Sequence, residues 1–202
     1  MKFDSNDLLN SIIERLSQID YVHASDIPNI DLYMDQVTTF MDSHLSSTKR
    51  HPEDKILTKT MINNYTKNNL LPPSNKKKYS KEHVLLLILI YYLKSFLSIK
   101  DIETLLGPVK EQYFSTNNGI DLTYIYEEIF KTQDIQLNLI KEALTQAFSR
   151  SEQTFAEVPE DDRNTLQNFA LLCSLSFDVY VKKMLIEKIL DDIVTKPENN
   201  NK

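Results

Sequence analysis

The chain has 202 residues and a formal net charge of −6, with 41% apolar and 26% charged residues. This composition is ordinary for a folded protein with a sizeable core and argues against wholesale disorder. Gly occurs only twice, at Gly107 and Gly119, whereas an average usage of about 7% predicts roughly fourteen. Barrels, sandwiches and dinucleotide-binding folds need many turns with positive φ, so the shortage of Gly disfavours them and predicts an all-α protein.

Cysteine usage and hydropathy indicate the cellular compartment of the protein. Cys173 is the only cysteine, which excludes an internal disulfide and a multi-cysteine metal site. The N-terminal residues carry acids and an amphipathic helical pattern and do not resemble a signal peptide. The longest apolar run, Val84 to Leu93, spans ten residues, about half of what a transmembrane helix needs. We therefore expect a cytoplasmic protein with no membrane partner.

Charge is distributed unevenly along the sequence. Residues 49–81 hold nine Lys or Arg and two acids, a net charge of +7, whereas residues 1–48 sum to −6 and residues 82–202 to −7. A basic segment within an acidic chain is a candidate binding surface for a polyanion. A solvated, Lys-rich surface loop is the alternative interpretation.

The first half of the chain predicts five helices in order. The apolar spacing indicates 5–19, 31–45, 58–68, 81–95 and 98–106, and the polar residues 46–55 form a loop. The second of these helices buries Leu32, Val37, Phe40, Met41 and Leu45.

Capping residues predict where the later three of these helices begin and end. Thr58 caps the third helix, and Asn69 ends it in the left-handed conformation. Ser80 caps the fourth helix, Ser98 and Asp101 form a capping box for the fifth, and Gly107-Pro108 closes the block.

The second half predicts helices over 121–130, 134–150 and 160–194, with Pro159 and the acids that follow it suited to the start of the last helix. Cys173 is expected to be a small buried residue of that helix. The resulting domains are an N-terminal helix and connector, 1–30, a second domain over 31–106, a helical domain over 107–195 and a disordered tail, 196–202.

Three motifs within residues 56–106 occur in a recognisable order. They are Met61-Ile62-x-x-Tyr65 with Leu70-Leu71-Pro72-Pro73, then Tyr79-Ser80-x-x-His83-Val84, then Leu97-Ser98-Ile99-x-Asp101-Ile102-x-x-Leu105-Leu106. This layout resembles the DNA-binding domain of the MerR family of bacterial transcriptional regulators. It also resembles an uncharacterised bacterial domain-of-unknown-function family with a MerR-like segment. The resemblance implies a winged helix-turn-helix over 31–106, with minimal β structure in a short wing, followed by a C-terminal helical bundle.

A helix-turn-helix places one helix in the major groove of duplex DNA. On 58–68, Ile62 and Tyr65 share an inward face, which leaves polar side chains outward. Asn suits adenine, and Lys and Thr suit phosphates or base edges, while a Lys-rich wing contacts the backbone. The predicted DNA-binding residues are Lys59, Thr60, Asn63, Asn64, Lys67, Lys76, Lys77 and Lys78.

The sequence departs from the MerR pattern at three places. Asn63 and Asn64 stand where the family has an Arg-aromatic pair, the wing turn is shorter and lacks Gly, and the loop 46–55 is longer. The leading hypothesis is a DNA-binding transcriptional regulator. The alternative is a non-enzymatic, all-α protein-interaction module on a winged-helix scaffold that no longer binds DNA.

No pattern indicates catalysis, a metal or a cofactor. The four His residues are scattered, and the acid pairs suit helix starts better than proton transfer. We therefore expect no enzyme, no catalytic residues, no metal site and no cofactor.

The sequence of the second half leaves open whether the protein binds a small-molecule effector and which residues form a dimer interface. Its aromatic residues form either a core or, less often, a pocket for a small-molecule effector. A homodimer is expected because regulators of this shape read paired half-sites. Helix 160–194 suits a dimer seam or, since it keeps no strict heptad, a globular bundle.

Overall fold

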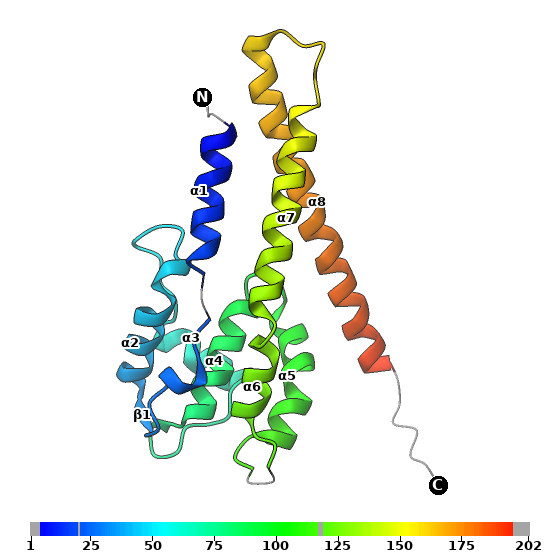
Figure 1. Cartoon of the computed structure of the whole chain (residues 1–202). Coiled ribbons are helices and arrows are strands. Elements are labelled where there is room, and N and C mark those ends of the chain that lie inside the picture. Colours follow the sequence, from blue (N-terminus) through cyan, green and yellow to red (C-terminus); the bar gives the residue numbers. More distant parts are fainter. Residues whose placement is uncertain (1–4, 20, 117–118, 196–202) are drawn as a thin grey trace. The chain divides into compact units, whose positions relative to one another are not determined.

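The computed structural model describes residues 5–19, 21–116 and 119–195 (Figure 1). Helices make up most of these residues, and the sheet found within them has two short antiparallel strands. The predicted all-α class with a minimal β element is therefore confirmed. None of the described helices is both long and apolar enough to cross a bilayer.

The described chain packs as two compact units. The central unit is Tyr21–Phe130, with which the described residues of Glu187–Lys202 are grouped, and the three-helix unit combines the described residues of Met1–Asp20 with Lys131–Ile186. The predicted domain ranges stay predictions, and the predicted disordered tail, 196–202, lies outside the described residues.

Within its described residues up to Phe130, the central unit contains five α-helices together with short 3-10 turns and the sheet. The elements are η1 Ala24–Asp26, β1 Leu32–Tyr33, α2 Met34–Leu45, η2 Ser46–Thr48, α3 Lys59–Lys67, β2 Lys78–Tyr79, α4 Lys81–Leu93, α5 Ile99–Tyr113 and α6 Leu122–Phe130.

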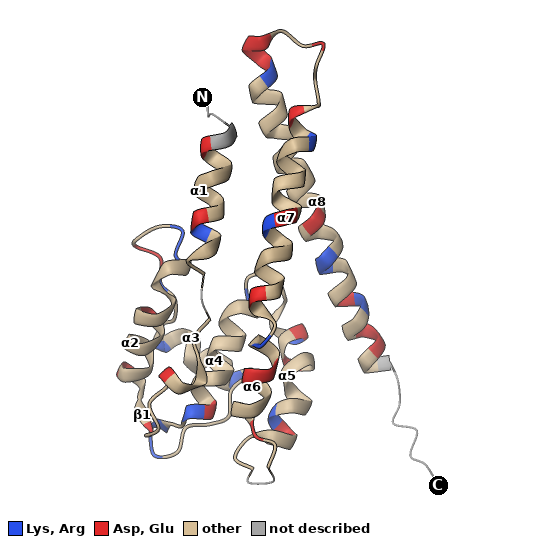
Figure 2. Cartoon of the chain, viewed as in Figure 1, with Lys and Arg blue, Asp and Glu red and all other residues tan. Residues whose placement is uncertain are grey.

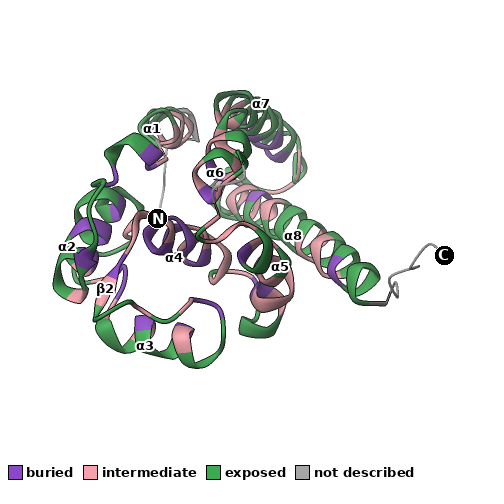
Figure 3. Ribbon diagram, turned by 90° about the horizontal axis from the view of Figure 1, so that it is seen from below, coloured by how far each residue is buried: buried purple, intermediate pink, exposed green. Residues whose placement is uncertain are grey.

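Helix α4 forms the centre of this unit (Figure 3). Its sequence is apolar on all sides, and such a helix is stable only when other elements surround it. Val84, Leu86 and Ile88 are fully buried. Helix α6 and strand β2 both pack against α4, and α5 packs against α6. Burial of each large aliphatic side chain stabilises the unit by about 1.5–3 kcal/mol.

The start of the predicted helix 31–45 differs from the observed structure. Leu32 and Tyr33 form β1 and pair with Tyr79 and Lys78 of β2, so α2 begins at Met34. The predicted apolar residues are buried, Leu32 on the strand and Val37, Phe40, Met41 and Leu45 on the helix. The strand was missed because its partner lies more than forty residues later in the chain.

The predicted end of the fifth helix at Gly107-Pro108 is wrong, because α5 continues to Tyr113. A proline inside a helix costs about 3 kcal/mol through a lost hydrogen bond and a steric clash. Contacts beyond the proline offset this cost: Lys110 is buried, and the Phe114 ring packs edge-on against His83 with centroids 4.8 Å apart.

The three-helix unit consists, in its described part, of α1 Ser5–Ser17, α7 Gln133–Glu152 and α8 Glu160–Thr195 up to Ile186. Its buried centre is formed by Leu144, Ala147 and Phe148 of α7 and Leu171 of α8, and α1 packs its apolar stripe against them. Pro159 precedes α8, and its carbonyl accepts from the N–H groups of Asp162 and Arg163.

Two expectations about the second half need correction. Cys173 is exposed, because it lies on the side of α8 that faces away from Leu171. Phe169, Phe177 and Tyr180 are also exposed, whereas Tyr126 and Phe148 are buried as a core requires. An apolar hollow of about 320 Å³ lies between α1, α7 and α8, but Phe148 is the one predicted aromatic residue that lines it. An effector pocket therefore stays a prediction.

Candidate nucleic-acid interface

Helix α3 has one buried and one exposed side, as its sequence predicts. The Thr58 hydroxyl accepts from the Met61 N–H at 3.2 Å and caps the helix. Ile62 and Tyr65 are buried on the inward side, and burial raises the pKa of the Tyr65 phenol. The polar side chains that face solvent are Lys59, Thr60, Asn63, Asn64 and Lys67.

The C-terminal end of α3 is fixed by several backbone bonds. Asn69 takes φ 56°, in the left-handed region that was predicted, and the Leu70 N–H donates back to the Tyr65 carbonyl at 2.9 Å. The buried Lys110 ammonium of α5 donates to the Asn69 carbonyl. A cation at this end also suits the negative end of the helix dipole. Helix α3 is therefore held at its end by α5.

A two-residue turn follows α3 and presents two lysines to solvent. Asn75 and Lys78 exchange backbone hydrogen bonds of 3.0 and 2.9 Å, so Lys76 and Lys77 form the tip of a hairpin. Both tip residues have positive φ, 49° and 65°. Two successive left-handed residues form a type I′ turn, which Asn-Gly usually occupies. Each lysine backbone therefore adopts a conformation that costs roughly 1–2 kcal/mol.

The sheet connects this hairpin to the start of α2. Lys78 pairs with Tyr33 across the sheet, and its ammonium lies 5.2 Å from the centre of the Tyr33 ring. Tyr33 is 54% exposed, so its ring extends the solvent-facing surface beside the hairpin. Tyr33 is not among the predicted contact residues, because only the pairing of β1 with β2 brings it to this surface.

One predicted contact residue is paired within the chain. The Lys59 ammonium forms an ion pair with Asp35 at the start of α2, and both side chains stay exposed. Lys67, Lys76 and Lys77 make no ion pair within the described residues. An exposed ion pair contributes little to stability and rearranges easily. Three of the predicted contact lysines, Lys67, Lys76 and Lys77, are therefore not neutralised by a carboxylate of the described residues.

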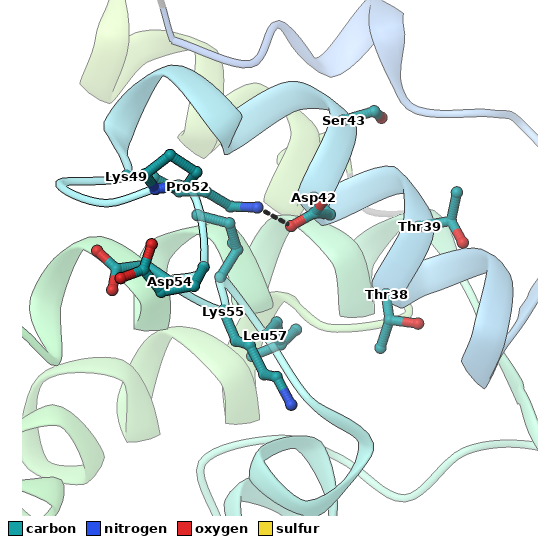
Figure 4. A pocket seen from close by; sticks show the side chains of 11 residues that line it. Thr38, Thr39, Asp42, Ser43, Lys49, Pro52, Asp54, Lys55 and Leu57 are labelled. Carbon is teal, nitrogen blue, oxygen red and sulfur yellow. Dashed lines mark ion pairs between the residues drawn. The ribbon is translucent and has the colours of Figure 1, made fainter.

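The loop between α2 and α3 is held against its neighbours at two points. Lys49 forms an ion pair of 2.7 Å with Asp42 of α2, and the Lys94 ammonium of α4 donates to the Ile56 carbonyl at 3.1 Å. Burial lowers the pKa of Lys94. A hollow of about 460 Å³ remains between this loop and α2, and Figure 4 shows the Lys49–Asp42 pair beside it. The hollow carries both signs of charge and is open to solvent.

The predicted residues thus lie on two neighbouring parts of one unit, an exposed helix side and a hairpin tip. Figure 2 shows basic segments on the loop that follows α2 and at the turn beside β1. Among the described residues, no group of three or more His, Cys, Asp or Glu side chains is arranged to hold a metal ion. The arrangement offers lysine ammonium groups, Asn amides and a hydroxyl, which are groups that contact phosphates and base edges.

No curated protein and no solved structure matches the chain. One family model, described as a domain of unknown function, DUF1836, matches residues 22–130. This range covers more than half of the chain and almost the whole central unit, including α3 and the hairpin. The expectation of a domain-of-unknown-function family is therefore confirmed. The chain belongs to the DUF1836 family.

Proposed function

We propose that this protein is a DNA-binding transcriptional regulator that reads duplex DNA with α3 and the Lys76–Lys77 hairpin tip. The central observation is that the outward side of α3 presents Lys67 with the amides of Asn63 and Asn64, and that the hairpin tip on the same compact unit presents two further lysines. In this proposal the order β1, α2, α3, hairpin and β2 is a MerR-like winged helix-turn-helix. Helix α3 enters the major groove and the lysines contact phosphates.

Backbone strain at the hairpin tip supports the proposal. Lysine is a poor choice for two successive positions with positive φ, and Asn-Gly would form the same turn at lower cost. Unfavourable conformations of this kind gather at functional sites. A contact between the turn and a polyanion would explain why two lysines occupy these unfavourable positions.

A duplex-binding titration tests the proposal. Lys76→Asn with Lys77→Gly keeps the turn, removes two charges and relieves strain. The free energy of unfolding should rise by about 1 kcal/mol. Affinity for a random-sequence duplex should fall, and the slope of log affinity against log salt should shrink by about 1.8.

Lys100→Asn with Lys182→Asn is the matched control, since it removes two exposed charges outside residues 49–81. This control should leave both affinity and slope unchanged. Equal affinities for the hairpin variant and the control would refute the proposed wing contact, and absence of salt-sensitive binding would refute the function.

A second candidate function is a protein-interaction module on the same scaffold. The Lys59–Asp35 ion pair favours this second candidate, because the pair neutralises one cation at the start of α3. Asn63 and Asn64 also replace the residues that a MerR-like domain uses there. A tight protein partner that shields residues 59–78 from hydrogen exchange, together with no DNA binding, would favour this candidate.

A further inference from the structure

The segment that contains α3 and the hairpin has a narrow selection of polar side chains. Residues 59–78 hold five Asn and five Lys, but no Arg, Gln, Asp or Glu. The one Arg within residues 21–130 is Arg50, which lies in the loop after η2. Of the side chains that make bidentate contacts with base edges, this segment therefore offers only Asn and Lys.

Two of the five Asn residues lie on the outward side of α3. At 100° per residue, Asn63 and Asn64 point about 50° to either side of the direction opposite the buried Ile62 and Tyr65. Both Asn side chains are exposed, and their amides make no hydrogen bond within the described residues. Each amide is therefore available to a ligand that approaches this side of the helix.

The next two Asn residues along the chain are used by the fold. The Asn68 amide donates to the Asn64 carbonyl at 2.8 Å, and the Asn69 amide donates to the Glu103 carboxylate at 3.4 Å. Asn63 and Asn64 make no comparable side-chain contact, although they lie in the middle of a nine-residue helix. Asn is a weak helix former, so local stability does not explain two of them there.

The hydrogen-bonding groups of an amide match one base. The Asn side chain presents a donor and an acceptor in one plane, as the N6 amino group and N7 of adenine require. Guanine presents two acceptors in the major groove and suits an Arg fork, whereas the cytosine amino group suits a carboxylate. Residues 59–78 provide neither of these partners. Lys67, in the last turn of α3, suits a phosphate.

We propose that Asn63 and Asn64 each read an adenine in the major groove, so that the protein selects duplexes with adenine–thymine pairs at two positions of its site. The inference rests on the proposed function and adds the class of sequence that α3 recognises. Each bidentate contact should favour adenine over another base by roughly 5-fold to 150-fold.

The first test is a selection with the full-length protein from a duplex library with a randomised centre. Bound duplexes should be enriched in adenine at two positions. Replacing these adenines by 7-deazaadenine removes the N7 acceptor but keeps base pairing and the minor groove. Each replacement should weaken binding by about fivefold or more. The same replacement at adenines outside the two positions is the control and should leave affinity unchanged.

Variants of α3 assign the two positions to residues. Asn63→Arg should change the selected base at one position from adenine to guanine, and Asn64→Arg should do so at the other. Lys67→Gln is the matched control on the same side of the helix. It should weaken binding to all sequences alike and reduce the salt slope by about 0.9, with the selected bases unchanged.

Three results would overturn the inference while the proposed function stands. These are salt-sensitive binding with no preference for adenine, a preference that 7-deazaadenine does not weaken, and Arg variants that select the same bases as the wild-type protein. Absence of binding to any duplex would overturn both the inference and the proposed function.

Discussion

Two buried polar side chains hold the segments around the hairpin. Lys110 donates to the Asn69 carbonyl at the end of α3. His83 accepts the Ser80 N–H on its Nδ1 at 3.0 Å and caps the start of α4. Tyr79 and Phe114 pack against the imidazole ring. Both side chains are themselves buried, so the replacement of either should cost more than a surface substitution does.

Removal of the Lys110 cation should weaken the end of α3. Lys110→Met keeps most of the side-chain volume but leaves the Asn69 carbonyl without this donor. The expected loss in free energy of unfolding is about 1.5–3 kcal/mol, the usual range for a hydrogen bond to a charged group. Urea denaturation measures it. Lys100→Met, an exposed position on the same helix, should change stability by less than about 0.5 kcal/mol; equal losses would contradict the role of Lys110.

His83 should make stability depend on pH. Its pKa is lowered from the ordinary 6.5, chiefly by burial, against the opposing effects of the Pro73 carbonyl and the Asp31 charge. Below the ordinary pKa the unfolded chain binds a proton that the folded chain does not yet accept. Stability is therefore fully present above that value and is lost as pH falls from it toward the folded-state pKa.

The matched variant is His83→Gln, because Gln at this position of a capping box still accepts from the N-cap N–H. The stability of the wild-type protein relative to His83→Gln should decrease between about pH 7.5 and about pH 5.5. Urea denaturation of both proteins at the two pH values measures this difference. A difference that stays constant with pH would show that His83 does not titrate as argued.

At the scale of elements, α5 illustrates a helix that survives two unfavourable residues. Gly107 and Pro108 lie in its interior, yet the helix runs to Tyr113. Outside the neighbouring residues and the helix backbone, no atom lies within 4 Å of the position of a Cβ at Gly107. Lys110 and the contact between Phe114 and His83 supply the tertiary interactions that keep the last turns helical.

Gly107→Ala should change the free energy of unfolding by less than about 1 kcal/mol, because the smaller loss of backbone entropy by alanine in a helix is opposed by the clash of its Cβ with the ring of the following Pro108. Gly119→Ala is the contrasting variant. Gly119 has φ +85°, where a side chain is strained, so this substitution should destabilise the protein. Thermal unfolding of both variants measures the difference, and equal losses of stability in the two variants would contradict the interpretation of α5.

At the scale of the molecule, two compact units have separate buried centres. Phe148 is buried among α1, α7 and α8, and Leu86 is buried within α4 of the central unit. The family match covers almost the whole central unit, so the proposed DNA-reading surface belongs to the family domain, whereas α8 lies outside it.

Cavities in the two cores should therefore have separate effects. Phe148→Ala should cost about 3–5 kcal/mol in the three-helix unit, and Leu86→Ala about 2–5 kcal/mol in the central unit. Hydrogen exchange followed by mass spectrometry should show each loss of protection within the unit that carries the substitution. Uniform loss over the chain from either variant would mean that the two units unfold as one.

The sequence by itself determined the all-α class, most helix positions and the polar outer side of α3. These follow from local properties, because apolar spacing, capping residues such as Thr58 and Ser98, and the shortage of Gly act within a few turns of the chain. Only the tertiary structure decided the pairing of β1 with β2, the continuation of α5 past Pro108 and the exposure of Cys173. Each depends on contacts between residues far apart in the sequence, and such contacts outweigh local preference.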